Sequence, residues 1–140
     1  MKRTFFVIAA MVTTSVFAQD KQTNVPVEVK NAFKKNFTGV SNIKWEKEGG
    51  EYEVSFSKSG KQMSAVYSAG GNLKETEEVI AINELPVGID AYVAQHYKGS
   101  KIKEAAKIKK ANGEINYEAE VNKVDVLFDS KGKFLKEVKE

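Results

Sequence analysis

Apolar and polar residues follow two different periods along this chain. In residues 26–37 and 86–97 the apolar positions recur every three to four residues, as on one face of an amphipathic helix. Each stretch opens with a proline and closes near a glycine, which is the usual punctuation of a helix. The pattern predicts two short helices, over residues 26–37 and 86–97.

Between and after these stretches the apolar residues alternate with polar ones. Tyr52, Val54 and Phe56, for example, alternate with charged or hydroxylated residues, which is typical of a half-buried strand. Turn signals separate these segments, so consecutive strands should pair as antiparallel hairpins. The turn signals are Gly49-Gly50, Ser59-Gly60, Gly70-Gly71-Asn72, Asn112-Gly113 and Lys131-Gly132.

The same order of features occurs twice. Val25-Pro26-Val27 aligns with Leu85-Pro86-Val87, and Tyr52-Glu53-Val54 aligns with Tyr117-Glu118-Ala119. We therefore predict an α+β fold of two tandem α-β-β-β-β repeats, over residues 25–84 and 85–140. They should form one antiparallel sheet of about eight strands, with the helices on one face and the other face open to solvent.

The first residues of the chain have the pattern of a secretory signal peptide. Lys2 and Arg3 precede an apolar run over residues 5–12 that is too short to span a bilayer. Val16-Phe17-Ala18 places small residues at the two positions that define a cleavage site. We expect a signal peptide over residues 1–18, a short extension over 19–24, and an exported chain with no membrane span after cleavage.

Charge and composition make several functional classes improbable. Beyond residue 18 the chain has 20 lysines, no arginine and 19 acidic residues, so it lacks the side chain best suited to bidentate phosphate or guanine contacts. We expect no nucleic-acid partner. The chain has no cysteine, which excludes disulfides and thiolate metal sites.

No arrangement of residues indicates an enzyme. His96 is the only histidine, too few for a metal centre of the usual ligands, and we expect it to be a surface or interface imidazole. The carboxylate pairs Glu51 with Glu53 and Glu118 with Glu120 are interpreted as parts of a solvated strand face. We therefore expect no catalytic residues, no cofactor and no metal site.

Two charged segments are interpreted as surface. The acidic run at Glu75, Glu77 and Glu78 lacks the spacing of a calcium loop and indicates surface charge. Around Ile108, Lys107 and Lys109 indicate a strand whose exposed side is basic and resists edge-to-edge aggregation.

Taken in order, these motifs resemble a known family. The Val-Pro opening, Lys44-Trp45-Glu46, the Gly-Gly-x-Tyr-Glu-Val segment at 49–54 and the second Leu-Pro copy are similar to periplasmic PepSY-like, or β-lactamase-inhibitor-like, proteins. The resemblance implies a tandem α+β fold similar to that of β-lactamase inhibitory protein, in exported proteins of Gram-negative bacteria. It implies no catalytic activity.

The function predicted from sequence is that of a noncatalytic periplasmic or secreted binding protein, an inhibitor or modulator whose partner is a protein or another envelope component. The alternative is a small-ligand or metal-binding sensor. The candidate interaction surface consists of Lys44, Trp45, Glu46, Glu51, Glu53 and Ser55. For Trp45, packing under the first helix is the favoured interpretation and an interface anchor is the alternative.

Overall fold

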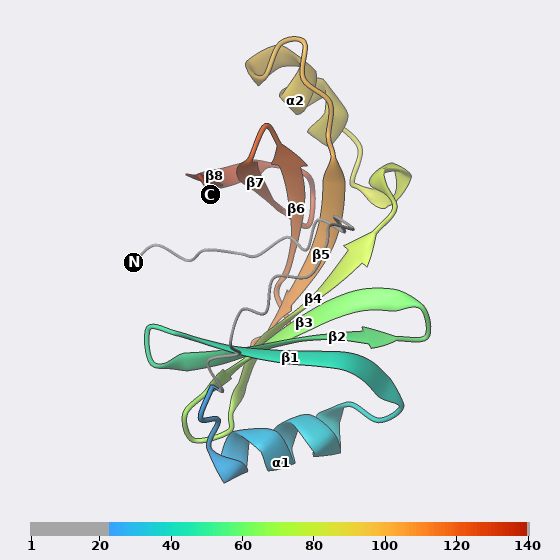
Figure 1. Cartoon of the computed structure of the whole chain (residues 1–140). Helices are drawn as coiled ribbons and strands as arrows, with labels where there is room; N and C mark the ends of the chain where they lie inside the picture. The colour runs from blue at the N-terminus through green and yellow to red at the C-terminus, as the bar shows by residue number, and fades with distance from the viewer. Residues whose placement is uncertain (1–22, 140) are drawn as a thin grey trace, which may run out of the picture.

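The computed structural model describes residues 23–139, so the predicted signal peptide and most of the predicted extension lie outside the described residues. The described part is an α+β structure in which each copy contributes one helix and four strands (Figure 1). In chain order the elements are α1 (Val27–Asn36), β1 (Val40–Glu48), β2 (Glu51–Lys58), β3 (Lys61–Ser68), β4 (Leu73–Ile80), the 3-10 turn η1 (Ile82–Glu84), α2 (Ile89–His96), β5 (Glu104–Lys110), β6 (Ile115–Val121), β7 (Val124–Asp129) and β8 (Phe134–Lys139).

The eight strands form one antiparallel sheet whose spatial order is the chain order, β1 to β8. In Figure 1 α1 lies at one end of this twisted sheet and α2 at the other. Residues directly opposite each other on antiparallel strands share a face. Successive pairs join Val54, in the core under α1, to Ala65, Thr76, Lys109 and Ile115, so these residues share one face. The same face of β6 carries the core under α2, and both helices therefore cover one face of the sheet. The predicted architecture is confirmed.

Each helix closes its own apolar core against its half of the sheet. In the first copy α1 inserts Val29 and Phe33, which are 0% and 3% exposed, onto Val54, Phe56 and Tyr67. The ring of Phe33 lies edge-on to that of Phe56, with centroids 5.1 Å apart. Aromatic packing of this kind adds to the stabilisation that comes from burying apolar area.

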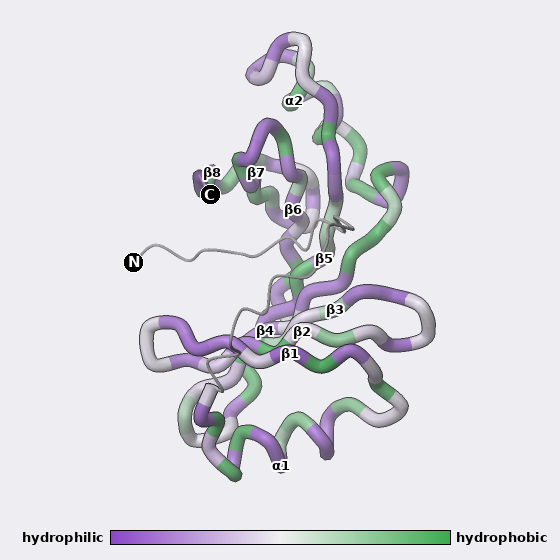
Figure 2. Tube along the Cα trace, viewed as in Figure 1, coloured by the Kyte–Doolittle hydropathy of each residue, from purple (hydrophilic) through white to green (hydrophobic). Residues whose placement is uncertain are grey.

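The second core uses the equivalent positions. Ile89 and Val93 of α2 take the places of Val29 and Phe33, and Phe128, like Tyr67, is fully buried. Figure 2 shows apolar segments, in green, in the strands next to α1 and in the strands toward α2, interspersed with hydrophilic ones. Each of the two sequence repeats therefore forms an apolar core of its own.

Two local features differ from the predictions. Helix α2 begins at Ile89, three residues later than predicted, because Gly88 has a left-handed backbone with φ 97° and Val87 is 97% exposed. Alternation with Trp45 predicts Ile43 on the apolar face, but Ile43 is 48% exposed because the register of β1 is irregular between Ser41 and Lys44.

The basic strand, β5, is not an edge strand. The expectation that its lysines resist edge-to-edge aggregation required an edge strand and is therefore wrong. β5 pairs with both β4 and β6, so it lies in the middle of the sheet. Lys107 and Lys109 are exposed, as predicted, because they lie on the helix-bearing face in the interval between the two cores.

One glycine in each copy brings a hairpin turn against the start of a helix. A Cβ on Gly71 would lie 2.9 Å from the carbonyl oxygen of Glu28, and one on Gly132 would lie 3.0 Å from that of Val87. Both glycines have positive φ, 83° and 81°. The turns after β3 and β7 can therefore pack on α1 and α2 only without a side chain at these positions.

Gly71→Ala should destabilise the fold more than Gly60→Ala. Both substitutions place alanine at positive φ, 83° and 78°, which costs about 1–2 kcal/mol. Only at Gly71 does the new methyl group also meet backbone, whereas nothing lies within 4 Å at Gly60. We expect the extra overlap to add roughly 1–3 kcal/mol to the loss of unfolding free energy, measured by urea denaturation. Equal losses in the two variants would show that the contact with Glu28 does not constrain the turn.

In the described part of the chain, no helix has the length and apolar character needed to cross a membrane.

Candidate functional site: the open face of the sheet

The sheet face turned away from both helices is here called the open face. Its side chains form rows across the strands, because directly opposite residues lie side by side. One row runs Glu46, Glu53, Val66, Glu75 and Lys110 over β1 to β5. The open face therefore combines acidic side chains with apolar ones.

Most residues of the predicted interaction surface lie on the open face. By register Lys44, Glu46, Glu51, Glu53 and Ser55 all point to this side of β1 and β2. Lys44 and Glu46 form an ion pair of 2.8 Å with exposed side chains, an arrangement that contributes little stability.

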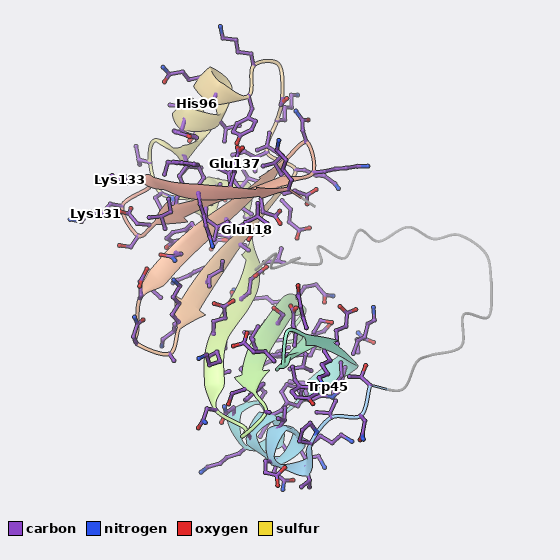
Figure 3. All side chains as sticks on the ribbon, turned by 90° about the vertical axis from the view of Figure 1, so that its left-hand side faces the viewer. Trp45, His96, Glu118, Lys131, Lys133 and Glu137 are labelled. Atoms are coloured by element: carbon purple, nitrogen blue, oxygen red, sulfur yellow. The ribbon has the colours of Figure 1, made fainter. Side chains whose placement is uncertain are left out.

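Trp45 does not share this face. It is paired with Val54, on the helix-bearing side of the sheet, and its ring lies edge-on to Phe33 with centroids 5.4 Å apart. Figure 3 shows it beside the α1 end of the molecule. The structure confirms the core-edge interpretation of Trp45 and removes this residue from the surface formed by its neighbours Lys44 and Glu46.

Seven of the carboxylates on the open face of strands β2 to β7 form a group that we call the acidic face. They are Glu53, Glu75, Glu77, Glu104, Glu118, Glu120 and Asp125. The sequence identified only Glu53 as part of an interaction surface. The interpretation of Glu118 and Glu120 as solvated was wrong, since each is 3% exposed, and the assignment of Glu75 to surface charge was wrong as well, since it is 9% exposed.

The neighbours of Glu118 explain part of this burial. On either side across the sheet lie Ala106 of β5 and Leu127 of β7, both nearly inaccessible themselves. Alternation along a strand predicts which face a side chain points to, but not how deeply residues of neighbouring strands bury it. The available signal was Ala106 and Ile108 on this face of β5 and Leu127 on this face of β7.

Burial and mutual repulsion make these carboxyl groups weak acids. Burial, and then repulsion from Glu53 and Glu75, raises the pKa of Glu77 to about 8. Burial, and then repulsion from Glu77 and Asp125, raises the pKa of Glu118 to about 10. At neutral pH an unbound acidic face therefore retains part of its protons.

Glu53 and Glu104 follow the same trend. Burial is the main cause of the raised pKa of Glu53, partly offset by a hydrogen bond that the Ser64 hydroxyl donates to it. Glu104 also has a raised pKa, from burial and from the facing Glu120. Glu53 and Glu118 occupy equivalent positions in the two copies, so this environment is duplicated with the fold.

The two copies differ in one row of the open face. In the first copy the row is Lys44, Ser55 and Ser64, three directly opposed residues of β1, β2 and β3. The equivalent row of the second copy, across β5, β6 and β7, contains only acids, and we call it the acidic row. Its members are Glu104, Glu120 and Asp125.

Glu120 of the acidic row has one lysine partner among the described residues. Lys103 donates a hydrogen bond of 3.1 Å to Oε1 of Glu120. Among the described residues, Oε2 of Glu120 and Oε2 of the adjacent Glu118 are buried and accept no hydrogen bond. Like charges directly opposite on neighbouring strands are destabilising, as are buried carboxylate oxygens without a donor.

Other candidate chemistry leads to no site. Within residues 23–139, no three histidine or carboxylate side chains are arranged to hold a metal ion. The His96 ring is exposed at the end of α2, where its Nδ1 lies 2.9 Å from the carbonyl oxygen of Tyr92 and its plane stacks on the Tyr92 ring, consistent with the predicted surface imidazole. Glu78 lies on the helix-bearing face and pairs with Lys61, apart from the acidic face.

Comparison with known sequences gives one family match. The sequence model of the family described as "Putative beta-lactamase-inhibitor-like, PepSY-like" matches twice, over residues 16–75 and 63–136. The two matches parallel the two structural copies. A search of curated proteins found no significant match.

Solved structures share the fold. A "putative periplasmic" protein from Bacteroides eggerthii superposes with a TM-score of 0.71 at 16% identity, covering 81% of this chain and 87% of that one. A DUF2874 family protein from Bacteroides uniformis has a TM-score of 0.69 at 17% identity, covering 80% and 87%. A BLIP-like protein from Bacteroides fragilis has a TM-score of 0.59 at 26% identity, covering 79% and 82%.

Proposed function

Because this chain belongs to the PepSY-like, β-lactamase-inhibitor-like family, we propose that it is a noncatalytic exported protein that binds a periplasmic protein through the open face of its sheet. Binding would make it an inhibitor or modulator of that partner. The predicted signal peptide and the periplasmic description of a structural neighbour support export to the periplasm. The likeness to a BLIP-like protein supports a protein partner.

The observation that carries this proposal is that the two faces of the sheet differ in composition and role. The helix-bearing face is committed to two closed cores, which account for the fold. The open face carries the acidic face, whose like charges oppose folding. Among the described residues, the buried Oε2 atoms of Glu118 and Glu120 also accept no hydrogen bond there. Groups that oppose stability and are nevertheless placed together on one surface are typical of functional sites.

Reversing two charges on the open face should weaken capture of the partner. We expect the Lys44→Glu, Glu53→Lys double variant, used as bait in an extract of the native envelope, to retain the bound partner several-fold less than the wild-type chain. Both positions lie outside the apolar cores, so the variant should keep the circular dichroism spectrum of the wild type.

The matched control places the same two reversals on α1. Glu28 and Lys34 are exposed on α1 and belong to no strand, so Glu28→Lys, Lys34→Glu leaves net charge and open face unchanged. This control should capture the partner as the wild type does. Equal capture by all three baits would contradict the assignment of binding to the open face.

A further inference from the structure

The two edge strands of the sheet differ in how their outer edges are used. Among the described residues, β1 and β8 each pair with one neighbouring strand. On β1 the carbonyl oxygen of Trp45 accepts a hydrogen bond of 3.2 Å from the Thr23 hydroxyl group. On β8 no described residue outside the β7–β8 hairpin hydrogen-bonds to the backbone. Since alternate residues of an antiparallel strand direct their N–H and C=O groups to opposite sides, half of those on β8 form a template for another strand.

The side chains along this edge are accessible to a partner. Phe134 and Leu135 are 36% and 45% exposed although both are large and apolar. Lys136, Glu137 and Lys139 are exposed as well. A strand that docked on β8 would remove apolar area of Phe134 and Leu135 from water, which favours association.

Phe134 is held in place by aromatic stacking. Its ring stacks on that of Tyr92, with centroids 5.2 Å apart, and Tyr92 stacks in turn on His96, with centroids 3.9 Å apart. The first copy has no such stack, because Ala32 and Asn36 occupy the positions equivalent to Tyr92 and His96, and its core closes without one. A ring that is already fixed loses little conformational freedom when another strand packs beside it.

The edge formed by β8 is basic. From Asp129 to the end of β8 the chain has four lysines and two acids. Both acids are engaged within the chain. The Asp129 carboxylate accepts hydrogen bonds of 2.9 Å from the backbone N–H groups of Lys131 and Lys133, and Glu137 accepts one from the Tyr97 hydroxyl group. Figure 3 shows Lys131 and Lys133 projecting outward beside β8. The edge therefore disfavours a basic strand and attracts an acidic one.

We infer that the outer edge of β8 binds an extended, acidic segment of another protein, which adds a ninth strand to the sheet. Backbone hydrogen bonds hold the segment, Phe134 and Leu135 contact its apolar side chains, and the lysines pair with its carboxylates. The inference goes beyond the proposed function, because it concerns an edge of the second copy and not the open face. In the first copy the equivalent strand, β4, is paired on both sides, so the duplication supplies one such edge.

The test uses two synthetic peptides of equal length and charge as probes. One has four Glu-Val repeats, an alternation that suits a strand, and the other has four Glu-Pro repeats, in which proline removes half of the backbone donors. Isothermal titration at low ionic strength should show saturable binding of the Glu-Val peptide to the wild-type chain. The Glu-Pro peptide should bind about tenfold more weakly or not at all. Equal binding of the two peptides would show that charge alone attracts them and would overturn the inference.

Removing two lysines from this edge should weaken binding of the Glu-Val peptide. We expect Lys133→Gln, Lys136→Gln to lower the affinity by about fivefold or more, since two charged contacts are lost. Both side chains are exposed, so the variant should fold, which its thermal unfolding curve verifies. The matched control, Lys30→Gln, Lys34→Gln, removes two exposed lysines of α1 and should bind as the wild type does. Equal weakening in the two double variants, or no saturable binding to the wild type, would contradict the inference.

Two further measurements distinguish this inference from its alternatives. If the wild-type chain dimerises and amide hydrogen exchange on β8 slows as the protein concentration rises, β8 pairs with a second copy and the inference is wrong. Lys44→Glu, Glu53→Lys changes the open face and should bind the Glu-Val peptide as the wild type does, even where it no longer captures the envelope partner. If this variant loses the peptide, the peptide binds the open face, and the inference about β8 fails while the proposed function stands.

Discussion

Glu118→Gln is expected to raise the stability of the protein at roughly pH 8 by about 1–4 kcal/mol while changing it little near pH 4. At the higher pH the unfolded chain ionises Glu118 freely, whereas the folded chain must either keep the proton or bury the charge beside Glu77 and Asp125. Near pH 4 the wild-type carboxyl group is protonated in both states and resembles the glutamine that replaces it.

The direction of the pH dependence follows from the raised pKa values. A carboxyl group with a raised pKa in the folded state contributes stability that is complete below its unfolded value, near 4.5, and is lost as pH rises. For Glu77 and Glu118 that loss extends through their folded values, about 8 and about 10. The wild type should therefore be most stable in mild acid and weaken steadily toward alkaline pH.

Thermal unfolding curves from about pH 4 to pH 10 measure both effects. The profile of Glu118→Gln should be flatter than that of the wild type and cross above it as pH rises. Glu28→Gln, an exposed carboxylate on α1, serves as control and should follow the wild type throughout. Parallel profiles for Glu118→Gln and the wild type would show that Glu118 is not in a buried, repulsive environment.

Phe33→Ala should have the largest effect on folding, a loss of about 3–5 kcal/mol of unfolding free energy. The side chain is 3% exposed and its ring contacts those of Phe37, Trp45 and Phe56. Removing it leaves a cavity where α1 meets the sheet, in the core that holds the first copy together.

Urea denaturation followed by the fluorescence of Trp45 is the appropriate measurement, because Trp45 is the only tryptophan and lies against Phe33. Val27→Ala is the control on the same helix, since Val27 is 61% exposed and should cost well under 1 kcal/mol. A loss for Phe33→Ala as small as that for Val27→Ala would show that α1 does not close the first core.

The architecture was predictable because it is duplicated and because each level of the sequence agrees with it. The two periods separate helices from strands, the glycine turns connect neighbours, and the equivalence of Val29 with Ile89 identifies the positions that close each core. The first residues of the elements and the turns between them were harder to predict. Asn122 and Lys123 form the β6–β7 hairpin with positive φ at both residues and without a glycine, so no turn was predicted there.

The site was predictable only in part, since strand alternation indicates a face but not an environment. Alternation of side chains along the strand was enough to place Glu53 on the open face and to favour a core position for Trp45. Burial of Glu118 and Asp125 depends on residues from other strands, which a single strand does not encode. The acidic row depends on register between β5, β6 and β7, which only the structure provides.

The most direct test of binding by the open face maps where the partner captured from the envelope contacts the folded chain. Amide chemical shifts of the isotopically labelled protein, recorded during a titration with that partner, report each residue separately. We expect the largest changes on the strands of the open face, around Lys44, Glu53 and Ser55, with α1 and α2 unaffected. Changes that centre on the helices, around exposed residues such as Glu28 and Asp90, would contradict the proposed function.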